Sequence, residues 1–220
     1  MIMDIRPYID HTVLRPTTSV EDVKKLCTEA MQYQFAAVCV PPPFVKNSKG
    51  LLLNSHVKVA TVIGFPFGYS VAAAKLAETD RAIEDGADEL DVVINLSALK
   101  SGSWSYLESE MRRLTEYIHI KEKIIKVIIE SGVLTNEEII RCCEIYSAVG
   151  IDYLKTSTGY AETGATLEAV QLMRANLPSG IKIKASGGIK TYDSAKMFIE
   201  AGASRIGTSS GVAIVKQQQV

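Results

Sequence analysis

Short apolar runs alternate with longer amphipathic segments from one end of the chain to the other. Each run is bounded by glycine, proline or hydroxyl-bearing residues, which is typical of strands. Eight strands are predicted, at residues 8–12, 36–40, 57–63, 89–95, 124–130, 151–155, 181–185 and 205–207.

Between these runs the apolar residues recur at helical spacing. Helices are predicted at residues 20–33, 43–53, 70–85, 105–120, 136–149, 167–176 and 192–201, with a short one at 210–215. Strand–helix alternation predicts a parallel sheet, and eight units favour closure into an α/β fold of the (β/α)8 TIM barrel type. We expect a single domain over residues 1–220, with a frayed tail at 216–220; an open doubly wound sheet is the alternative.

Side-chain alternation places charged groups inside the predicted barrel. In the strand at 89–95 the even positions are apolar and should face the helices, so Asp91 faces the interior. The same alternation gives the inward-facing charged residues Asp91, Lys126, Glu130, Lys155 and Lys184. Barrel interiors are usually filled by branched apolar side chains, so these charges indicate a functional site. The alternative is a self-neutralising structural network.

Two lysines occupy matching positions. Lys155 and Lys184 each end an apolar run, and each is followed by a loop rich in glycine and hydroxyl groups. A lysine amine attacks a carbonyl only when neutral, and at a reference pKa of about 10.4 roughly one in 2,500 is neutral at pH 7. A second ammonium and burial lower that pKa, so the pair favours Schiff-base chemistry. Spacing alone does not say which lysine reacts, and either one could instead be a strand-end cation reaching solvent.

Two loops are suited to phosphate. Ser186-Gly187-Gly188 follows the seventh strand, and residues 207–211, which include Gly207, Ser209 and Ser210, follow the eighth. The loops after these two strands often hold phosphate in such barrels. The predicted substrate is therefore a phosphorylated carbonyl compound.

Composition narrows the class of protein. The formal net charge is −1 and there is no basic run, so a nucleic-acid partner is not expected. No apolar run reaches about 18 residues and no signal-peptide core is apparent, so we expect no membrane association and a cytoplasmic location.

Histidine and cysteine spacings do not indicate a metal site. The three histidines are far apart, with only His11 at a strand end, and the four cysteines form no C-x-x-C motif. We expect free thiols and no metal. Cys39 closes the second strand and could face the site, although a buried structural cysteine is the favoured interpretation.

The chain resembles the deoxyribose-phosphate aldolase family over essentially its full length. The motifs that carry the resemblance are Asp10-His11-Thr12, Asp91-Val92-Val93-Ile94-Asn95, Lys155-Thr156-Ser157-Thr158-Gly159 and Lys184-Ala185-Ser186-Gly187-Gly188. The resemblance implies a class I carbon–carbon lyase on a TIM barrel. Such an enzyme reversibly cleaves 2-deoxy-D-ribose 5-phosphate to acetaldehyde and D-glyceraldehyde 3-phosphate in deoxyribose phosphate catabolism. The resemblance further implies that the enzyme needs no cofactor and that a homodimer is possible.

The resemblance also implies roles for individual residues. Lys155 is expected to be the Schiff-base nucleophile, Lys184 the neighbour that lowers its pKa, and Asp91 the proton-transfer group acting through water. Substrate and phosphate binding is expected from Thr158, Gly187, Gly188, Gly207, Ser209 and Ser210. Three charged residues are expected to lie behind the catalytic and binding residues as charge partners: Asp10, Lys126 and Glu130.

The sequence departs from the family at two places. Tyr160 stands where some members have lysine or phenylalanine, and the tail ends Gln219-Val220 without the terminal tyrosine that some members carry. Three alternatives remain: another Schiff-base aldolase of a phosphorylated sugar, a non-catalytic sugar-phosphate-binding barrel, and a phosphate-binding isomerase that uses acid–base chemistry.

Overall fold

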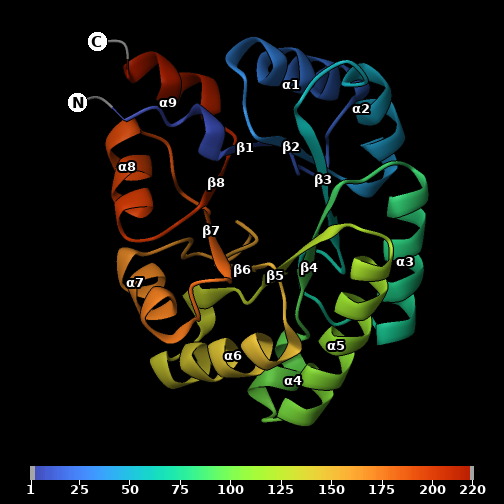
Figure 1. The fold of residues 1–220 in the computed structure, drawn as a ribbon, viewed down its shortest axis with the longest axis vertical. Coiled ribbons are helices and arrows are strands. Elements are labelled where there is room, and N and C mark those ends of the chain that lie inside the picture. The colour runs from blue at the N-terminus through green and yellow to red at the C-terminus, as the bar shows by residue number, and fades with distance from the viewer. Residues whose placement is uncertain (1–2, 219–220) are drawn as a thin grey trace.

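The computed structural model describes residues 3–218 and forms a closed barrel of eight parallel strands surrounded by helices (Figure 1). Each strand pairs with the next in the chain, and β1 also pairs with β8, which closes the sheet. The predicted (β/α)8 barrel is therefore confirmed, and the alternative of an open doubly wound sheet is wrong.

The strands are short, as the lengths of the apolar runs predict. They are β1 (Ile9–Thr12), β2 (Ala37–Val40), β3 (Lys58–Ile63), β4 (Glu89–Val93), β5 (Ile124–Ile128), β6 (Tyr153–Lys155), β7 (Lys182–Ser186) and β8 (Arg205–Thr208).

Helices follow every strand. They are α1 (Val20–Tyr33), α2 (Val45–Leu51), α3 (Ala72–Glu84), α4 (Leu96–Lys100), α5 (Trp104–Ile120), α6 (Asn136–Val149), α7 (Leu167–Asn176), α8 (Tyr192–Glu200) and α9 (Gly211–Gln217). Short 3-10 helices lie at η1 (Arg6–Tyr8), η2 (Pro42–Phe44) and η3 (Ser131–Val133).

Helix boundaries agree fully with the prediction for α1, α6 and α7, each of which begins at a side-chain cap. Ser19 caps the start of α1 and Thr135 caps the start of α6. Each capping side chain accepts a hydrogen bond from the backbone N–H three residues later, and the acidic side chain of that later residue accepts one from the backbone N–H of the capping residue. Both helices occupy the predicted residues. The short α4 was not predicted; its first turn is capped by the Asn95 side chain, which accepts from the Ala98 N–H.

Two predicted strands end early. The prediction for β4 runs to residue 95, but the strand ends at Val93 because Asn95 caps α4. The prediction for β5 runs to residue 130, but the strand ends at Ile128, and Glu130 has a left-handed backbone with φ of 54°. Glu130 therefore lies at the rim of the barrel and is not part of the strand ladder.

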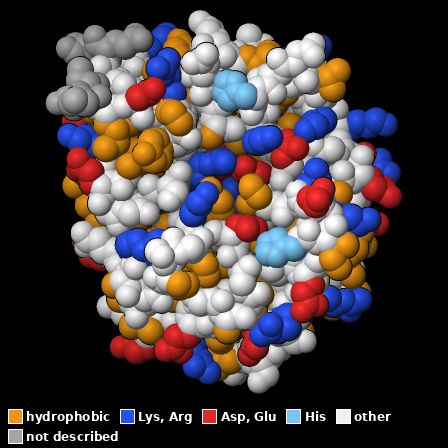
Figure 2. Space-filling view, viewed as in Figure 1, with side chains coloured by type: hydrophobic (Ala, Val, Ile, Leu, Met, Phe, Trp, Pro, Cys, Tyr) orange, Lys and Arg blue, Asp and Glu red, His pale blue; other side chains and the backbone are white. Residues whose placement is uncertain are grey.

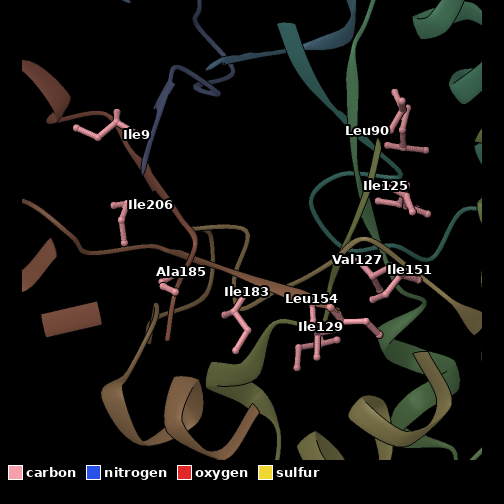
Figure 3. Close-up of a cluster of buried hydrophobic side chains, with 14 of the residues drawn as sticks. Ile9, Leu90, Ile125, Val127, Ile129, Ile151, Leu154, Ile183, Ala185 and Ile206 are labelled. Atoms are coloured by element: carbon pink, nitrogen blue, oxygen red, sulfur yellow. The ribbon is translucent and has the colours of Figure 1, made fainter. Parts of the chain in front are cut away.

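The main hydrophobic core lies between the outer face of the strands and the helices. Figure 3 shows part of it, with Leu90, Ile125, Val127, Leu154 and Ile183 among the labelled side chains. These are the apolar positions that alternation assigned to the helix-facing side, and all are fully buried. Their burial fixes the register of β4 to β7 and so sends the intervening charged residues inward.

The barrel interior has an apolar part and a charged part. Cys39, Ala60 and Val62 from β2 and β3 form a separate buried cluster, with Leu14 and Phe65 packed against it. Cys39 is thus a buried residue inside the barrel, and burial raises the pKa of its thiol. All four cysteines are buried and free, as expected.

Acidic and basic side chains lie close together near the middle of the face seen in Figure 2. No helix among residues 3–218 is long and apolar enough to cross a membrane. Within the tail predicted at 216–220, Lys216 and Gln217 belong to α9, and residues 219–220 lie outside the described residues.

Candidate active site

The predicted catalytic residues meet inside the barrel. Lys155 of β6 lies opposite Lys184 of β7 in the strand register, and Asp91 comes from β4. Both lysine Nζ atoms donate to the same oxygen, Asp91 Oδ2, each at 2.7 Å. The two amines are therefore at most twice that distance apart. All three side chains are at least 97% buried.

Further charges surround this trio. Lys126 Nζ donates to the other Asp91 oxygen at 2.8 Å and forms an ion pair with Glu89 at 2.5 Å. Lys184 Nζ lies 2.5 Å from Asp10 Oδ2. The geometry thus brings together Asp10 and Lys126, two of the three charge partners expected from the sequence.

Glu89 and Arg205 complete the network, and the sequence analysis did not assign them to the site. The Arg205 guanidinium donates to Asp10 and makes two bonds to Glu89, the shorter at 2.8 Å. Glu89 has the same strand parity as Asp91, which is a signal that could have identified it. Both residues open their strands, where a charged side chain usually reaches solvent.

Electrostatics separate the two lysines. Burial lowers the pKa of Lys155, and the Lys184 ammonium lowers it further, against the opposing effect of Asp91. Burial also acts to lower the pKa of Lys184, but the carboxylates of Asp10 and Asp91 outweigh it and raise that pKa. Lys155 is therefore the amine that loses its proton more readily, which the sequence could not decide.

Asp91 stays ionised in this environment. Burial alone would raise its carboxyl pKa, but the charges of Lys126, Lys155 and Lys184 hold the pKa well below its ordinary value. An ionised carboxylate that contacts the reactive amine can accept and return a proton, directly or through water.

Glu130 and Thr158 form a separate contact at the rim. The Thr158 hydroxyl and backbone N–H both donate to the Glu130 carboxylate, and burial raises the pKa of that carboxyl. Among the described ion pairs Glu130 takes part in none, so its expected role as a charge partner has no support from the contacts. Its contact instead holds the loop that follows Lys155.

A pocket of about 600 Å³ opens above Lys155. Five of the residues expected to bind substrate or phosphate line it, namely Thr158, Gly187, Gly188, Gly207 and Ser209. Ser210 is not among the described lining residues; its backbone N–H donates to the Thr208 hydroxyl. The pocket is also lined by Arg15, Lys25 and Lys190, which were not predicted, because segments that follow different strands meet only in the folded chain.

Tyr160 bridges two sides of the pocket mouth. Its hydroxyl donates to the Leu14 carbonyl at 2.7 Å, and its ring packs edge-on against Phe65 with centroids 5.4 Å apart. Leu14 follows β1, Phe65 follows β3 and Tyr160 follows β6. One of the two places at which the sequence departs from the family that it resembles therefore links three loops.

His11 has a different environment from that of a metal ligand. Its Nε2 lies 2.8 Å from Glu29 Oε2, and its ring contacts Phe35 edge-on. No group of three or more histidine, cysteine, aspartate or glutamate side chains within residues 3–218 could hold a metal ion.

Comparisons with known proteins identify the family of this chain. Residues 5–217 match the model of a family described as DeoC/LacD family aldolase. The chain is 50% identical to the deoxyribose-phosphate aldolase of Caldicellulosiruptor saccharolyticus over 97% of this chain and 98% of the relative. It is 51% identical to the deoxyribose-phosphate aldolase of Thermococcus gammatolerans, with 97% and 96% covered.

Solved structures give the same result. A putative deoxyribose-phosphate aldolase from Coccidioides immitis superposes with a TM-score of 0.94 at 39% identity, covering 98% of this chain and 86% of that one. The deoxyribose phosphate aldolase of Aeropyrum pernix, described as having a unique tetrameric structure, superposes with a TM-score of 0.92 at 32% identity, with 98% and 91% covered.

Proposed function

Because this chain belongs to the DeoC/LacD family of aldolases, we propose that it reversibly cleaves 2-deoxy-D-ribose 5-phosphate to acetaldehyde and D-glyceraldehyde 3-phosphate. One observation carries the proposal: a buried lysine with a lowered pKa, Lys155, stands at the base of a pocket beside Lys184 and Asp91. This arrangement is suited to forming a Schiff base with an aldehyde.

The reaction begins with the neutral Lys155 amine, which attacks the C1 aldehyde of the open-chain sugar. Proton transfer from nitrogen to oxygen gives a neutral carbinolamine. Its hydroxyl then takes up one further proton from water, leaves as water, and an iminium ion with one positive charge remains. Asp91, which contacts the Lys155 nitrogen, is placed to move these protons.

Carbon–carbon cleavage follows from the iminium. The C3 hydroxyl gives its proton to Asp91, directly or through water, and the electrons of that O–H bond form the new carbonyl. The C2–C3 bond pair moves to the iminium to give a neutral enamine. Glyceraldehyde 3-phosphate is released. The enamine then takes a proton at C2, and water hydrolyses the iminium to acetaldehyde and free Lys155.

Phosphate binding is assigned to the loops after β7 and β8. The pocket is lined there by Gly187, Gly188 and Ser209. The glycines have no side chain that would keep a phosphate away from the backbone N–H groups. Lys190 and Arg15 line the same pocket and supply positive charge, which the tyrosine at position 160 lacks. Arg15 is bound to Asp22 at 2.9 Å and is mostly exposed, so it is free to turn toward an anion.

The test is to trap the Schiff base. The protein is treated with 2-deoxyribose 5-phosphate and borohydride, and the intact mass and the modified peptide are measured. We expect one stable adduct on Lys155 that is absent from Lys155→Ala. Lys182→Ala is the matched control, because Lys182 is an exposed lysine on the same strand as Lys184.

The outcomes separate the rival functions. No adduct on a folded protein that still binds the sugar phosphate would favour the binding barrel or the isomerase. An adduct with a different aldehyde product would favour another Schiff-base aldolase.

We further propose that the enzyme works in the cytoplasm and self-associates, with a dimer as the expected unit. Support comes from its membership of a family of metabolic aldolases and from the tetramer described for the Aeropyrum pernix relative. Sedimentation velocity over a range of protein concentrations tests the assembly.

A further inference from the structure

Six charged side chains form one connected cluster inside the barrel beneath Lys155. We call them the interior charge cluster: Asp10, Glu89, Asp91, Lys126, Lys184 and Arg205. It contains three carboxylates and three cations, so its formal charge is zero. Lys155 touches the cluster through Asp91, and a proton on Lys155 therefore adds an unbalanced positive charge to a buried space.

Arg205 and Glu89 lie at the end of the cluster farthest along the strands from Lys155, because both open their strands whereas Lys155 ends its own. Their guanidinium and carboxylate meet through two bonds of 2.8 and 3.3 Å. Arg205 also donates to Asp10, which pairs with Lys184, and Glu89 pairs with Lys126. The pair is thus connected to Lys126 and Lys184, two of the three lysines that contact Asp91.

We propose that Arg205 and Glu89 are positioning residues for the reaction: the Arg205 guanidinium opposes a proton on Lys155, the Glu89 carboxylate favours one, and the two together hold the protonation of Lys155 in balance. The inference rests on the proposed function, since it concerns the amine assigned there as the nucleophile. Neither residue touches the substrate pocket; each acts on Lys155 through the charge it contributes.

The other groups around Lys155 are unchanged in the variants that test this proposal. Cys39 is a fully buried thiol whose raised pKa keeps it neutral, and Tyr153 lies under the Arg205 guanidinium at 5.9 Å. Glu130 is the remaining nearby carboxyl; it is bonded to Thr158, burial raises its pKa and the Lys155 charge lowers it, so it is a further acidic group that interacts with Lys155 in every variant.

The charge balance predicts opposite effects for two substitutions. Arg205→Gln removes a positive charge, so Lys155 should hold its proton more tightly and the acidic limb of kcat/KM should move to higher pH. Glu89→Gln removes a negative charge, so the limb should move to lower pH. A unit charge about 10 Å away at an effective dielectric of about 20 shifts a pKa by about one unit, and we expect shifts of that size.

The test measures Lys155 directly as well as the enzyme. Protein labelled with carbon-13 at the lysine ε position is titrated by NMR, and the Lys155 signal is assigned by its absence from Lys155→Met. The pH profile of kcat/KM with 2-deoxyribose 5-phosphate is recorded for the same variants. The double variant Glu89→Gln/Arg205→Gln is again balanced and should return both readouts close to those of the unaltered chain.

Arg205→Lys is the matched control, because it keeps the positive charge but loses the paired hydrogen bonds from the guanidinium to Glu89. It should leave the Lys155 titration in place even if stability falls. If Arg205→Gln does not fold by circular dichroism, Glu89→Gln and Arg205→Lys still decide the matter.

Shifts of the same sign in both single variants, or no shift in Glu89→Gln, would overturn the proposal and leave a purely structural pair. The NMR titration needs no turnover. A failure to form a Schiff base in the unaltered chain would therefore count against the proposed function and not against this inference.

Discussion

Lys155 and Lys184 donate to the same oxygen of Asp91, yet only Lys184 has a second carboxylate beside it. Asp10 lies 2.5 Å from the Lys184 nitrogen. Two carboxylates outweigh burial and keep Lys184 charged, whereas Lys155 shares one carboxylate with two other amines. A single neighbouring side chain therefore gives chemically identical residues different roles.

The hydrogen bond made by the Tyr160 hydroxyl should also have a measurable effect on substrate binding at the pocket mouth. Tyr160→Phe keeps the ring contact with Phe65 and removes the bond to the Leu14 carbonyl, which ties the β1 and β6 loops together. A hydrogen bond of this kind contributes about 0.5–1.5 kcal/mol, so we expect KM for the sugar phosphate to rise about two- to tenfold. We expect kcat to stay within about twofold, because Lys155 lies on a strand.

Steady-state kinetics check this prediction, with Tyr69→Phe as the control. Tyr69 is also exposed, and its hydroxyl makes no hydrogen bond to the described part of the chain. A fall in kcat with an unchanged KM would show instead that the Tyr160 hydroxyl takes part in proton transfer.

Residue roles were only partly predictable from sequence. Strand parity identified Asp91, Lys126, Lys155 and Lys184 as inward-facing, because alternation is a local property. Parity does not reveal partners, however. The choice between the two lysines depends on Asp10, which comes from the first strand and reaches Lys184 only after the barrel closes.

At the scale of elements, the loops after β6 and β7 touch through glycine. An added Cβ at Gly187 would lie 2.9 Å from the Gly164 Cα, and one at Gly164 would lie 2.3 Å from the Gly187 carbonyl oxygen. The two loops therefore pack backbone to backbone. This contact fixes the loop that we propose to bind phosphate.

Comparing Gly187→Ala with Gly188→Ala separates the cost of backbone strain from the cost of pushing the two loops apart. Both glycines have left-handed backbones, with φ of 89° and 82°, but a Cβ at Gly188 meets nothing within 4 Å. We expect Gly188→Ala to cost about 1–3 kcal/mol from strain alone. Gly187→Ala should cost more and should also raise KM, because the loop must move away from Gly164.

Denaturant unfolding and KM measure both effects. Gly164→Ala serves as the control for the contact without left-handed strain, and it should resemble Gly187→Ala. Equal costs for Gly187→Ala and Gly188→Ala would mean that the loops can separate freely.

Element boundaries were predictable where a local signal sets them. The capping boxes at Ser19 and Thr135 can be identified in the sequence, and α1 and α6 begin where predicted. The early end of β5 was not predictable, because the left-handed turn at Glu130 is held by Thr158, a residue from the next loop.

At the scale of the whole molecule, the buried carboxylates make stability depend on acid. The pKa values of Asp10 and Asp91 are lowered in the folded state by the lysines and the arginine around them. A carboxyl with a lowered folded pKa stabilises the fold above its unfolded pKa of about 3.9, and that stability is lost as the pH falls through the folded pKa.

We therefore expect the free energy of unfolding to be nearly constant from pH 7 to about 5 and to fall steeply below about 4. Denaturant titrations followed by circular dichroism at several pH values check this. At pH 7, adding about 1 M salt should change little, because salt screens exposed pairs far more than buried ones. Stability that persisted to pH 2, or that depended strongly on salt, would contradict the buried network as its source.

The burial of Lys155 has one more consequence. The protein does not distinguish an ammonium from an iminium by charge, since both place one positive charge on the same nitrogen in the same enclosed space. Whatever makes the protonated amine unfavourable there makes the iminium unfavourable as well. In the proposed reaction, forming the enamine removes that charge, so the surroundings that release a proton from the resting lysine would also favour the breaking of the carbon–carbon bond.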